Sequence, residues 1–553
     1  MSDCAPCFVA EVADAAADMA SDHRIPKHFR AIHKSPDKQL WMQAVNSELQ
    51  ALLDMHCYDL VDRDDVSAGA HIIGHTWVFR LKTNADGTIS RYKARICVNG
   101  SQQVPGRDYG ETYAPVAHAA TIRLLLAVAT HLNLSLRQYD IKLAFISANL
   151  DRVVYMRAPS GSNSPPGSVW ALRRCLYGLA QSPRLYNKKL HSVLTRIGWT
   201  QSTHDPCLYF RRDKSDLSLL AVVVDDFLLA TSNLKLAKAF RTDMEATFDF
   251  KSLGQPAYMI GLHLEHGSNH LSISQTQYIR DMETRFSDSL GPFAPTHTPA
   301  PGGLRLVKTG IADAAASEPG DRGLNRSLVG SLMYAVVSRP DIATIVSMCA
   351  RFMENPTTAH LTAARRVLCY LLTTRDLTLT YTRTASPCLL AYVDASWAAD
   401  PDTRRSRYGY AVYFGRALVS WRSKLHACVC VSSAEAEYIG ATEAVKEVMW
   451  MRHLLGELGL DQGTTEIFED NMAVIKMAKS AIVSARNKHM QLKLHYVRER
   501  VEASEVKLTY VSTKMQKADS LTKNLARALF TVMRTYLLFP LTLRPDAGSE
   551  GAY

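Results

Sequence analysis

Two adjacent aspartates interrupt the most apolar segment of this 553-residue chain and constrain its fold more than any other feature. Residues 218–231 read SLLAVVVDDFLLAT, so two β-prone apolar runs meet at Asp225-Asp226. The pattern predicts two strands joined by a tight turn. A solvated turn would explain the pair, because aspartate is common in turns. Alternatively, apolar surroundings make two neighbouring negative charges costly, and a bound cation would hold them.

Asp140 adds a third carboxylate to this pair. It ends residues 134–140, which alternate like a strand, and it lies 85 residues before Asp225. Three carboxylates on adjacent strand ends can bridge two Mg²⁺ ions about 4 Å apart, the arrangement used for in-line phosphoryl transfer. The three aspartates therefore predict a two-metal site as the alternative to a solvated turn.

Composition and charge narrow the class of protein. With 47% hydrophobic and 21% charged residues the chain is an ordinary globular one, of about three to four domains. No apolar stretch is long enough to predict a membrane span. Acidic residues near the start argue against a signal peptide, and eleven scattered cysteines are typical of reduced thiols inside a cell. The net charge of +11 and three basic runs, at residues 91–95, 173–189 and 486–500, favour a nucleic-acid partner over solvated surface charge alone.

Hydrophobic periodicity predicts the order of elements along the chain. We expect helices at residues 41–53, 119–132, 184–197, 327–374 and 433–458. We expect strands at residues 76–81, 89–98, 134–140, twice within 218–231, from 389, at 466–468 and at 507–511. A stretch rich in Pro, Gly, Thr and Ala at residues 291–325 predicts a linker.

A second set of acidic residues occupies the part of the chain after that linker. Asp394 follows an apolar strand, and Glu437 lies on a helix whose capping box, Ser432-x-x-Glu435, accounts for Glu435 alone. Asp470 follows the strand at 466–468, and Asp519 comes near the start of the last helix. Each acid taken singly fits a surface position. Taken in order, strand, helix, strand end and helix match the layout of ribonuclease H.

The chain resembles the reverse transcriptase–ribonuclease H segment of copia-type LTR retrotransposon polyproteins, from about residue 36 to 530. The polymerase half of the match is carried by Tyr92-Lys-Ala-Arg95, Tyr139-Asp-Ile-Lys-Leu-Ala-Phe145, Leu176-Tyr-Gly-Leu179 with Gln181-x-Pro-Arg184, Val224-Asp-Asp226 and Arg339-Pro-Asp-Ile342. The other half is carried by Asp394-Ala-Ser-Trp-Ala398, Ser432-Ser-x-Glu-Ala-Glu-Tyr438, Glu469-Asp-Asn471, Lys488-His489 and Ala518-Asp519.

The resemblance implies an α+β fold: a right-hand polymerase with fingers, palm and thumb, then connection helices and an α/β ribonuclease H-like domain. The implied ranges are a weakly ordered lead (1–35), polymerase (36–290), linker and connection (291–385), ribonuclease H (386–530) and tail (531–553). The implied partners are an RNA template, a DNA primer, RNA–DNA hybrid and deoxynucleoside triphosphates, without a membrane. The oligomeric state is left open, and the expected location is cytoplasmic virus-like particles or the nucleus.

The resemblance also assigns roles to particular residues. Two Mg²⁺ or Mn²⁺ ions per active site would be held by the polymerase trio Asp140, Asp225 and Asp226, and by the ribonuclease H residues Asp394, Glu437, Asp470 and Asp519. For the incoming nucleotide, the family pattern implies Lys93 and Arg95 on the triphosphate, Phe145 as a steric gate against the ribose 2′-hydroxyl, and Gln181 against the nucleotide. Their simpler interpretations are surface charge, a core aromatic ring and a polar loop residue.

Several positions depart from the family pattern. Val223 replaces the usual tyrosine before Val-Asp-Asp, Ala180 replaces a lysine, and Asn99 lies where a basic residue is usual. Ile146-Ser-Ala148 replaces Leu-Asn-Gly. Two alternatives to a full reverse transcriptase therefore stay open: a decayed element copy that merely binds nucleic acid, and a nuclease whose polymerase is inactive.

Overall fold

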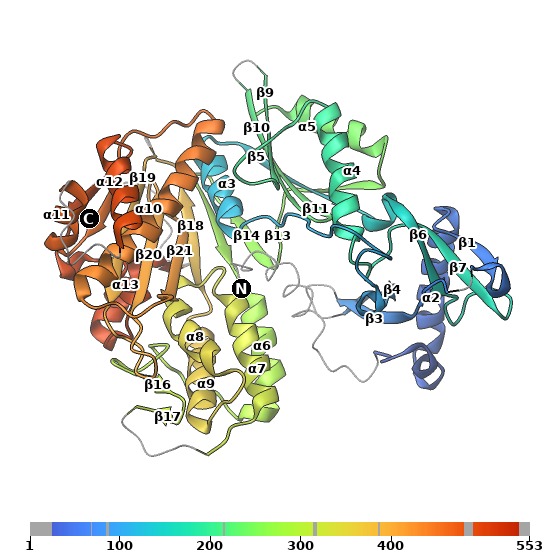
Figure 1. Ribbon diagram of the computed structural model, residues 1–553, viewed down its shortest axis with the longest axis horizontal. Coiled ribbons are helices and arrows are strands. Elements are labelled where there is room, and N and C mark those ends of the chain that lie inside the picture. The colour runs from blue at the N-terminus through green and yellow to red at the C-terminus, as the bar shows by residue number, and fades with distance from the viewer. Residues whose placement is uncertain are drawn as a thin grey trace. The chain divides into compact units, whose positions relative to one another are not determined.

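A computed structural model describes residues 25–540, except 68, 84–87, 214–215, 313–317, 385–386 and 481–489. The chain forms two compact units (Figure 1). The first contains the described residues up to 117 together with 137–255, and the second contains 118–136 together with the described residues from 256 onward. Among the helices described, none is both long enough and apolar enough to span a bilayer.

The first unit contains three sheets and three long helices. Its helices are α2 (Lys38–Asp54), α4 (Ser182–Arg196) and α5 (Leu234–Glu245). Its strands are β1 (Tyr58–Asp62), β2 (Ile72–Ile73), β3 (His75–Thr83), β4 (Ile89–Val98), most of β5 (Ser135–Ile141), β6 (Asn149–Arg157), β7 (Ser168–Arg174), β8 (Thr200–Gln201), β9 (Leu208–Asp213), β10 (Asp216–Val223), β11 (Asp226–Thr231) and β12 (Phe250–Gly254).

The sheet that carries the aspartates has the strand order β12-β5-β11-β10-β9-β8. Strands β10 and β11 pair antiparallel from Ser218↔Thr231 to Val223↔Asp226, which confirms the predicted hairpin. Their inward side chains, such as Leu220 and Phe227, are fully buried against α4 and α5. The strands predicted at residues 76–81 and 89–98 are confirmed as well, since β3 and β4 pair antiparallel.

The second unit contains the remaining elements. Its helices are α3 (Ala119–His131), α6 (Thr276–Leu290), α7 (Arg322–Ala335), α8 (Ala343–Cys349), α9 (Thr358–Thr373), α10 (Ser433–Glu457), α11 (Met472–Lys479), α12 (Gln491–Glu502) and α13 (Arg527–Leu537). Its strands are β13 (Tyr258–Met259), β14 (Leu262–His266), β15 (His270–Ser274), β16 (Leu306–Val307), β17 (Gly310–Ile311), β18 (Leu377–Thr382), β19 (Leu389–Ser396), β20 (Arg407–Phe414), β21 (Ala417–Leu425), β22 (Thr465–Glu469), β23 (Val506–Tyr510) and β24 (Phe539–Pro540).

A mixed five-stranded sheet organises the later part of this unit. Its strand order is β21-β20-β19-β22-β23; the first three strands are antiparallel, and β22 and β23 run parallel to β19. Helix α10 packs on β19 and β20, and Gly440 lets it approach, because a Cβ there would lie 3.1 Å from the Tyr408 side chain. The predicted α+β content and mixed sheet are confirmed.

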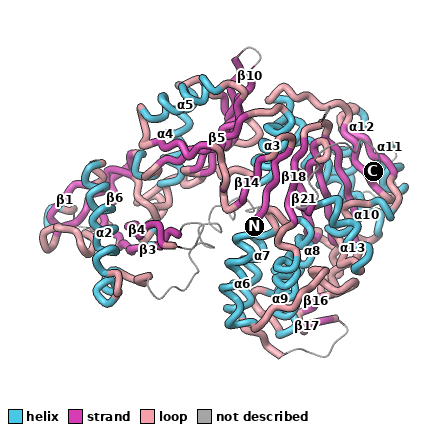
Figure 2. Tube along the Cα trace, turned by 180° about the vertical axis from the view of Figure 1, so that it is seen from behind, coloured by secondary structure: helices cyan, strands magenta, loops and turns pink. Residues whose placement is uncertain are grey.

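Helices α6, α7, α8, α9 and α13 share one apolar core, and Figure 2 shows the first four grouped together. Ala300 and Leu306, within the predicted linker, are buried in that core, as is Met533 in the predicted tail. The compact units divide at 255, before α6, and the polymerase range to 290 stays a prediction. Ile32, in the predicted lead, is also fully buried. Composition alone does not reveal these few anchoring apolar residues.

Helix α3 packs with the second unit, although both its flanking segments in sequence belong to the first. It contacts strands β15, β18 and β21. The buried Arg123 guanidinium donates to the carbonyl oxygens of Val419 (2.8 Å) and Val337 (3.0 Å) and lies 3.8 Å from the ring centroid of Trp421. Burial lowers the pKa of Arg123 to about 10, so the side chain is still charged at neutral pH.

Candidate functional sites

The first candidate site is the turn between β10 and β11. Val224 has a φ of +58°, a left-handed conformation that β-branched residues rarely adopt. The backbone N–H of Ile141 donates to the carbonyl oxygen of Asp225 over 3.0 Å, which fixes the end of β5, and with it Asp140, beside the turn. The structure therefore brings Asp140 next to Asp225-Asp226, as predicted from their positions on strand ends.

Tyr186 of α4 supports this turn, and sequence reasoning missed it. Its hydroxyl donates to the carbonyl oxygen of Val224 over 2.9 Å. Burial, together with the carboxylates of Asp225 and Asp140, raises the pKa of the Tyr186 phenol well above its usual value. The phenol therefore stays protonated and keeps donating to the strained turn. The helical spacing of α4 predicts only that Tyr186 faces the core.

Two of the four predicted nucleotide-contacting residues lie close to the turn, through a chain of ring contacts. The Arg95 guanidinium is 4.3 Å from the ring centroid of Tyr177, and Tyr177 is 4.9 Å from Phe145, centroid to centroid. Phe145 in turn lies 5.8 Å from Tyr186. Arg95 and Phe145 are both partly exposed. Both side chains are therefore partly accessible to solvent.

The other two predicted nucleotide contacts have different surroundings. Lys93 is partly exposed on β4, opposite Arg80. Gln181 is 1% exposed: its Oε1 accepts from Gln103 Nε2 (3.0 Å) and its Nε2 donates to the carbonyl oxygen of Asp108 (3.2 Å). The Gln181 amide therefore links the loops that contain Gln103 and Asp108. Its contact with a nucleotide stays a prediction.

Three positions that depart from the family pattern lie in the first unit: Val223, Asn99 and Ala180. Val223 is buried at the end of β10, where a larger side chain would reach the surface of the turn. Asn99 accepts a hydrogen bond from the Thr76 hydroxyl (2.8 Å), and the backbone N–H of Ala180 donates to Gln103 (2.7 Å). At these positions the chain lacks the charged or aromatic side chains that are usual in the family.

The second candidate site lies where β19 and β22 diverge. The two parallel strands pair only from Leu390↔Glu466 to Tyr392↔Phe468, and the chain then continues into Asp394 on one strand and Glu469-Asp470 on the other. The gap beyond two diverging parallel strands is a common location of binding sites in α/β sheets. Glu437 approaches from α10 and Asp519 from a 3₁₀ turn at Asp519–Leu521, not from the start of α13 as predicted.

Three carboxylates of this group have the spacing of a metal site. One ligand oxygen each of Glu437, Glu469 and Asp470 lies within 4.8 Å of the others. Oε2 of Glu437 and Oε2 of the fully buried Glu469 have no hydrogen-bond partner. Buried unpartnered carboxylate oxygens fit a divalent cation, because hard cations prefer such ligands. In the described part of the chain no other acidic, His or Cys group meets this spacing, so Asp140, Asp225 and Asp226 lie further apart.

Asp394 and Asp519 complete the group on the side of β19. Burial, helped by the nearby charges of Asp519 and Asp470 and opposed by Lys523, raises the pKa of Asp394 to about 7. Burial also raises the pKa of Glu437, and burial together with the charge of Glu437 raises the pKa of Glu469. Such shifts mark carboxylates gathered into one poorly solvated place.

Glu469 and Lys523 are the members of this site that sequence reasoning missed. Glu469 directly precedes Asp470 in the sequence. Which of the two side chains faces the other carboxylates depends on the residue at which β22 ends, and the sequence does not show this residue. The Lys523 ammonium lies 2.8 Å from Oδ1 of Asp519 and 3.7 Å from Oδ2 of Asp394, which also accepts from the Thr522 hydroxyl. Lys523 thus supplies the positive charge in the metal-free state. Lys488 and His489, quoted from the family pattern, lie outside the described residues.

The raised pKa of Asp394 predicts how metal-free stability depends on pH. The folded carboxyl keeps its proton to about pH 7, while the unfolded one loses it near pH 4, so ionisation favours unfolding as pH rises across this interval. We expect Asp394→Asn to gain about 5 °C in thermal midpoint relative to the native chain between pH 5 and pH 8, without metal.

The thermal midpoint of the native chain must be compared with that of the variant at each pH, because the buried His426 makes stability rise with pH, opposite to the effect of Asp394. Burial lowers the pKa of His426 to about 4, so its contribution to stability is lost as pH falls below about 6.5. The measurement is a thermal melt in chelator at each pH, repeated with Mg²⁺. A difference between the two chains that does not vary with pH would contradict the assignment of Asp394.

Comparisons with known proteins agree with this architecture. Residues 55–297 match the family described as Reverse transcriptase (RNA-dependent DNA polymerase). The chain is 35% identical over 524 residues to the Retrovirus-related Pol polyprotein from transposon TNT 1-94 of Nicotiana tabacum, which covers 93% of the chain and 39% of that polyprotein. It is 34% identical to the corresponding polyprotein from transposon RE1 of Arabidopsis thaliana (89% and 33%) and 33% identical to a transposon Ty5-1 protein of Saccharomyces cerevisiae (56% and 100%).

Solved structures offer a weaker comparison. LC11-RNase H1 in complex with an RNA/DNA hybrid is 14% identical, covers 25% of this chain and 96% of its own, and has a TM-score of 0.20. At that score the likeness adds nothing to the assignment of the second site, which depends on its strand order and carboxylates.

Residues 55–297 therefore define the class: this part of the chain is a reverse transcriptase domain. More specifically, the chain belongs to the copia-type retrotransposon Pol polyproteins. It spans 39% and 33% of the length of the tobacco and Arabidopsis polyproteins that it matches.

Proposed function

We propose that this chain is an RNA-directed DNA polymerase with a right-hand fold, and that its second unit degrades the RNA strand of the resulting RNA–DNA hybrid. The observation that carries the proposal is the presence of a separate carboxylate group in each unit, one at the β10–β11 turn and one between β19 and β22. Two activities suit one chain, because synthesis on RNA leaves a hybrid whose RNA must be removed before the second DNA strand is made.

In the first unit, Asp140, Asp225 and Asp226 would hold two Mg²⁺ or Mn²⁺ ions. Bound there, the ions would activate the primer 3′-hydroxyl and neutralise the leaving pyrophosphate. Lys93 and Arg95 would contact the triphosphate, and Phe145 would lie under the sugar. Tyr186 holds the turn in its strained conformation, so the aspartates need less reorganisation when a nucleotide binds.

In the second unit, Glu437, Glu469, Asp470, Asp394 and Asp519 would hold two ions. Bound there, the ions would lower the pKa of an attacking water and stabilise the leaving 3′-oxygen. The ammonium of Lys523 already lies against Asp519 and Asp394, so metal binding would displace it or share its place. Selection of the RNA strand would depend on its 2′-hydroxyls.

A second candidate function is a nuclease with a weakened polymerase. Val223, Ala180 and Asn99 all lie in the first unit and all lack the side chain that is usual in the family. The second carboxylate group keeps every predicted acid and gains Glu469. A decayed copy that only binds nucleic acid would show neither activity.

One experiment separates these functions. The full chain is assayed on a homopolymer RNA template with a DNA primer, with and without Mg²⁺, beside cleavage of a labelled RNA–DNA hybrid. Both activities are expected, and both should stop in chelator. Cleavage without extension would favour the nuclease, and binding without either reaction would favour the decayed copy.

The gate role of Phe145 gives a specific prediction. Its ring is held between Tyr177 and Tyr186, so shortening it should open space for a 2′-hydroxyl without moving the turn. We expect Phe145→Val to raise ribonucleotide incorporation relative to deoxynucleotide by about 10- to 100-fold. The measurement is the ratio of kcat/KM values for the two sugars in primer extension. An unchanged ratio with normal deoxynucleotide incorporation would remove the role.

A further inference from the structure

Gln516 is a fully buried side chain that joins three segments of the second site. Its Nε2 donates to the carbonyl oxygen of Val393 on β19 over 2.9 Å and to that of Phe468 on β22 over 3.4 Å. Its Oε1 accepts from the backbone N–H of Ala518 over 3.2 Å. A primary amide has two N–H donors, so one side chain can bond both carbonyl groups.

These three contacts lie immediately beside the candidate metal ligands. Val393 precedes Asp394, Phe468 precedes Glu469, and Ala518 precedes Asp519. Direct pairing of β19 with β22 stops at Tyr392↔Phe468. Beyond this pair, the Gln516 amide links the two strands through its hydrogen bonds to Val393 and Phe468. It therefore sits where the separation of the two strands determines the separation of the carboxylates that follow them.

We propose that Gln516 is a positioning residue: by bridging β19, β22 and the 516–519 segment it sets the spacing of Asp394, Glu469 and Asp519 for divalent-cation binding. This inference rests on the proposed metal site of the second unit. It concerns the geometry of the ligands, since the Gln516 amide is occupied by backbone groups and would touch neither ion nor substrate.

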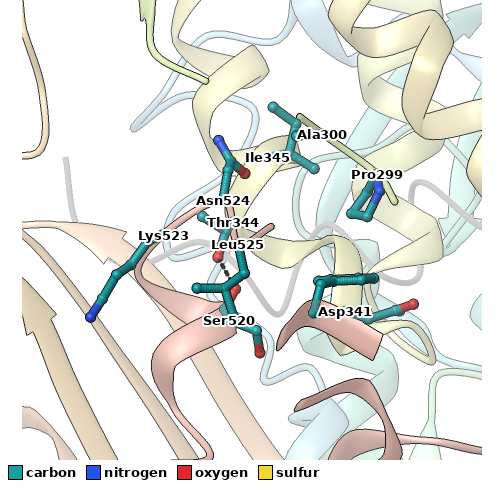
Figure 3. Close-up of a pocket in the computed structure, with 10 residues that line it drawn as sticks. Pro299, Ala300, Asp341, Thr344, Ile345, Ser520, Lys523, Asn524 and Leu525 are labelled. Carbon is teal, nitrogen blue, oxygen red and sulfur yellow. Dashed lines mark hydrogen bonds between the residues drawn. The ribbon is translucent and has the colours of Figure 1, made fainter. Parts of the chain in front are cut away.

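The loop around Gln516 is also held by contacts of the residues that follow the glutamine. The Lys517 ammonium lies 4.8 Å, 5.3 Å and 4.8 Å from the ring centroids of Tyr392, Tyr413 and Tyr536. The Thr344 hydroxyl donates to the carbonyl oxygen of Ser520 over 2.7 Å, as Figure 3 shows.

Figure 3 also shows the small cavity behind this turn. Ser520, Asn524 and the stem of Lys523 line it, and the Lys523 nitrogen points away from the other labelled residues. Its volume of about 10 Å³ gives room for one water-sized sphere.

The test compares Gln516→Met with Gln275→Met in the full chain. Methionine fills similar volume without hydrogen bonds. Gln275 is also a buried glutamine of the second unit; its amide bonds Ser338 and Tyr334, away from the carboxylates. Two quantities are measured: the Mg²⁺ concentration that gives half of the metal-induced rise in thermal midpoint, and kcat and KM for hybrid cleavage.

For Gln516→Met we expect the half-saturating Mg²⁺ concentration to rise about 10-fold or more, with kcat reduced at fixed Mg²⁺ and the KM for hybrid unchanged. Mg²⁺ is a sensitive probe because it demands near-ideal octahedral geometry. Gln275→Met should lower stability without moving the Mg²⁺ midpoint. If Gln516→Met fails to fold, Gln516→Asn, whose amide is too short to span the strands, is measured in its place.

The outcomes separate the two proposals. A Mg²⁺ midpoint for the Gln516 variant within twofold of the native chain overturns the positioning role, whatever happens to cleavage. If the native chain binds Mg²⁺ but cleaves no hybrid, the nuclease function is overturned. The Mg²⁺ titration of the Gln516 variant then still decides the positioning role. A native chain that binds no Mg²⁺ overturns both.

Discussion

Replacing Asp225 with asparagine is expected to abolish template-directed DNA synthesis while hybrid cleavage continues. Asp225 occupies the tip of the β10–β11 turn, and its backbone carbonyl is bonded to β5, so the substitution removes one negative charge without changing side-chain size or the turn. Loss of a metal-binding carboxylate should reduce the rate by about 1,000-fold or more, equivalent to about 4 kcal/mol of transition-state stabilisation.

The matched control is Asp213→Asn. Asp213 is exposed at the opposite end of the same strands, where it pairs with Asp216 across β9 and β10. Primer extension at saturating deoxynucleotide should be unchanged in this control. Synthesis at more than a tenth of the native rate in Asp225→Asn would show that the turn is not the polymerase site.

Replacing Asp394 with asparagine is expected to have the reverse effect. Asp394 is 3% exposed and receives the Thr522 hydroxyl and the Lys523 ammonium, so it is held in place before metal binds. Asparagine removes the charge that would bind the cation, and hybrid cleavage should fall by about 1,000-fold or more while DNA synthesis persists. The measurement is release of labelled RNA fragments from a preformed hybrid.

Glu466→Gln serves as the control for this variant. Glu466 lies on β22, three residues before Glu469, and its carboxylate pairs with Lys507 on the outer strand. Cleavage should remain close to native, because this acid faces away from the gap between β19 and β22. Persistent RNA degradation by Asp394→Asn in a nuclease-free preparation would remove the second site.

Sequence patterns predict the acidic residues at the ends of apolar or alternating segments well, because the signal is local. Apolar runs that stop at an acid are visible in the chain itself: Asp225 and Asp394 follow such runs, and Asp140 ends a segment that alternates like a strand. Glu469 was missed because β22 and its neighbour diverge at that point, and the last strand residue turns inward along with the residue that follows it. The divergence is a property of two strands whose paired residues, such as Leu390 and Glu466, are 76 residues apart, and no local pattern encodes it.

Other parts could not be predicted because they depend on packing partners. Gln181 has the composition of a polar loop, yet Gln103 and Asp108, more than 70 residues earlier, enclose it. The Pro- and Gly-rich stretch indicates a linker, yet Leu306 is fully buried. An apolar helix such as α3, whose residues from Thr121 to Ala129 are all buried, carries a signal for burial but none for the sheet that it packs against.

The place of α3 has a practical consequence for dissecting the chain. The backbone passes between the two units after residues 117, 136 and 255, so no single cut separates them into complete halves. A fragment that starts at residue 256 would lack Arg123 and would leave the faces of β15, β18 and β21 without their covering helix. An autonomous C-terminal nuclease should consequently need residues 118–136 restored, either fused to the fragment or added as a separate peptide.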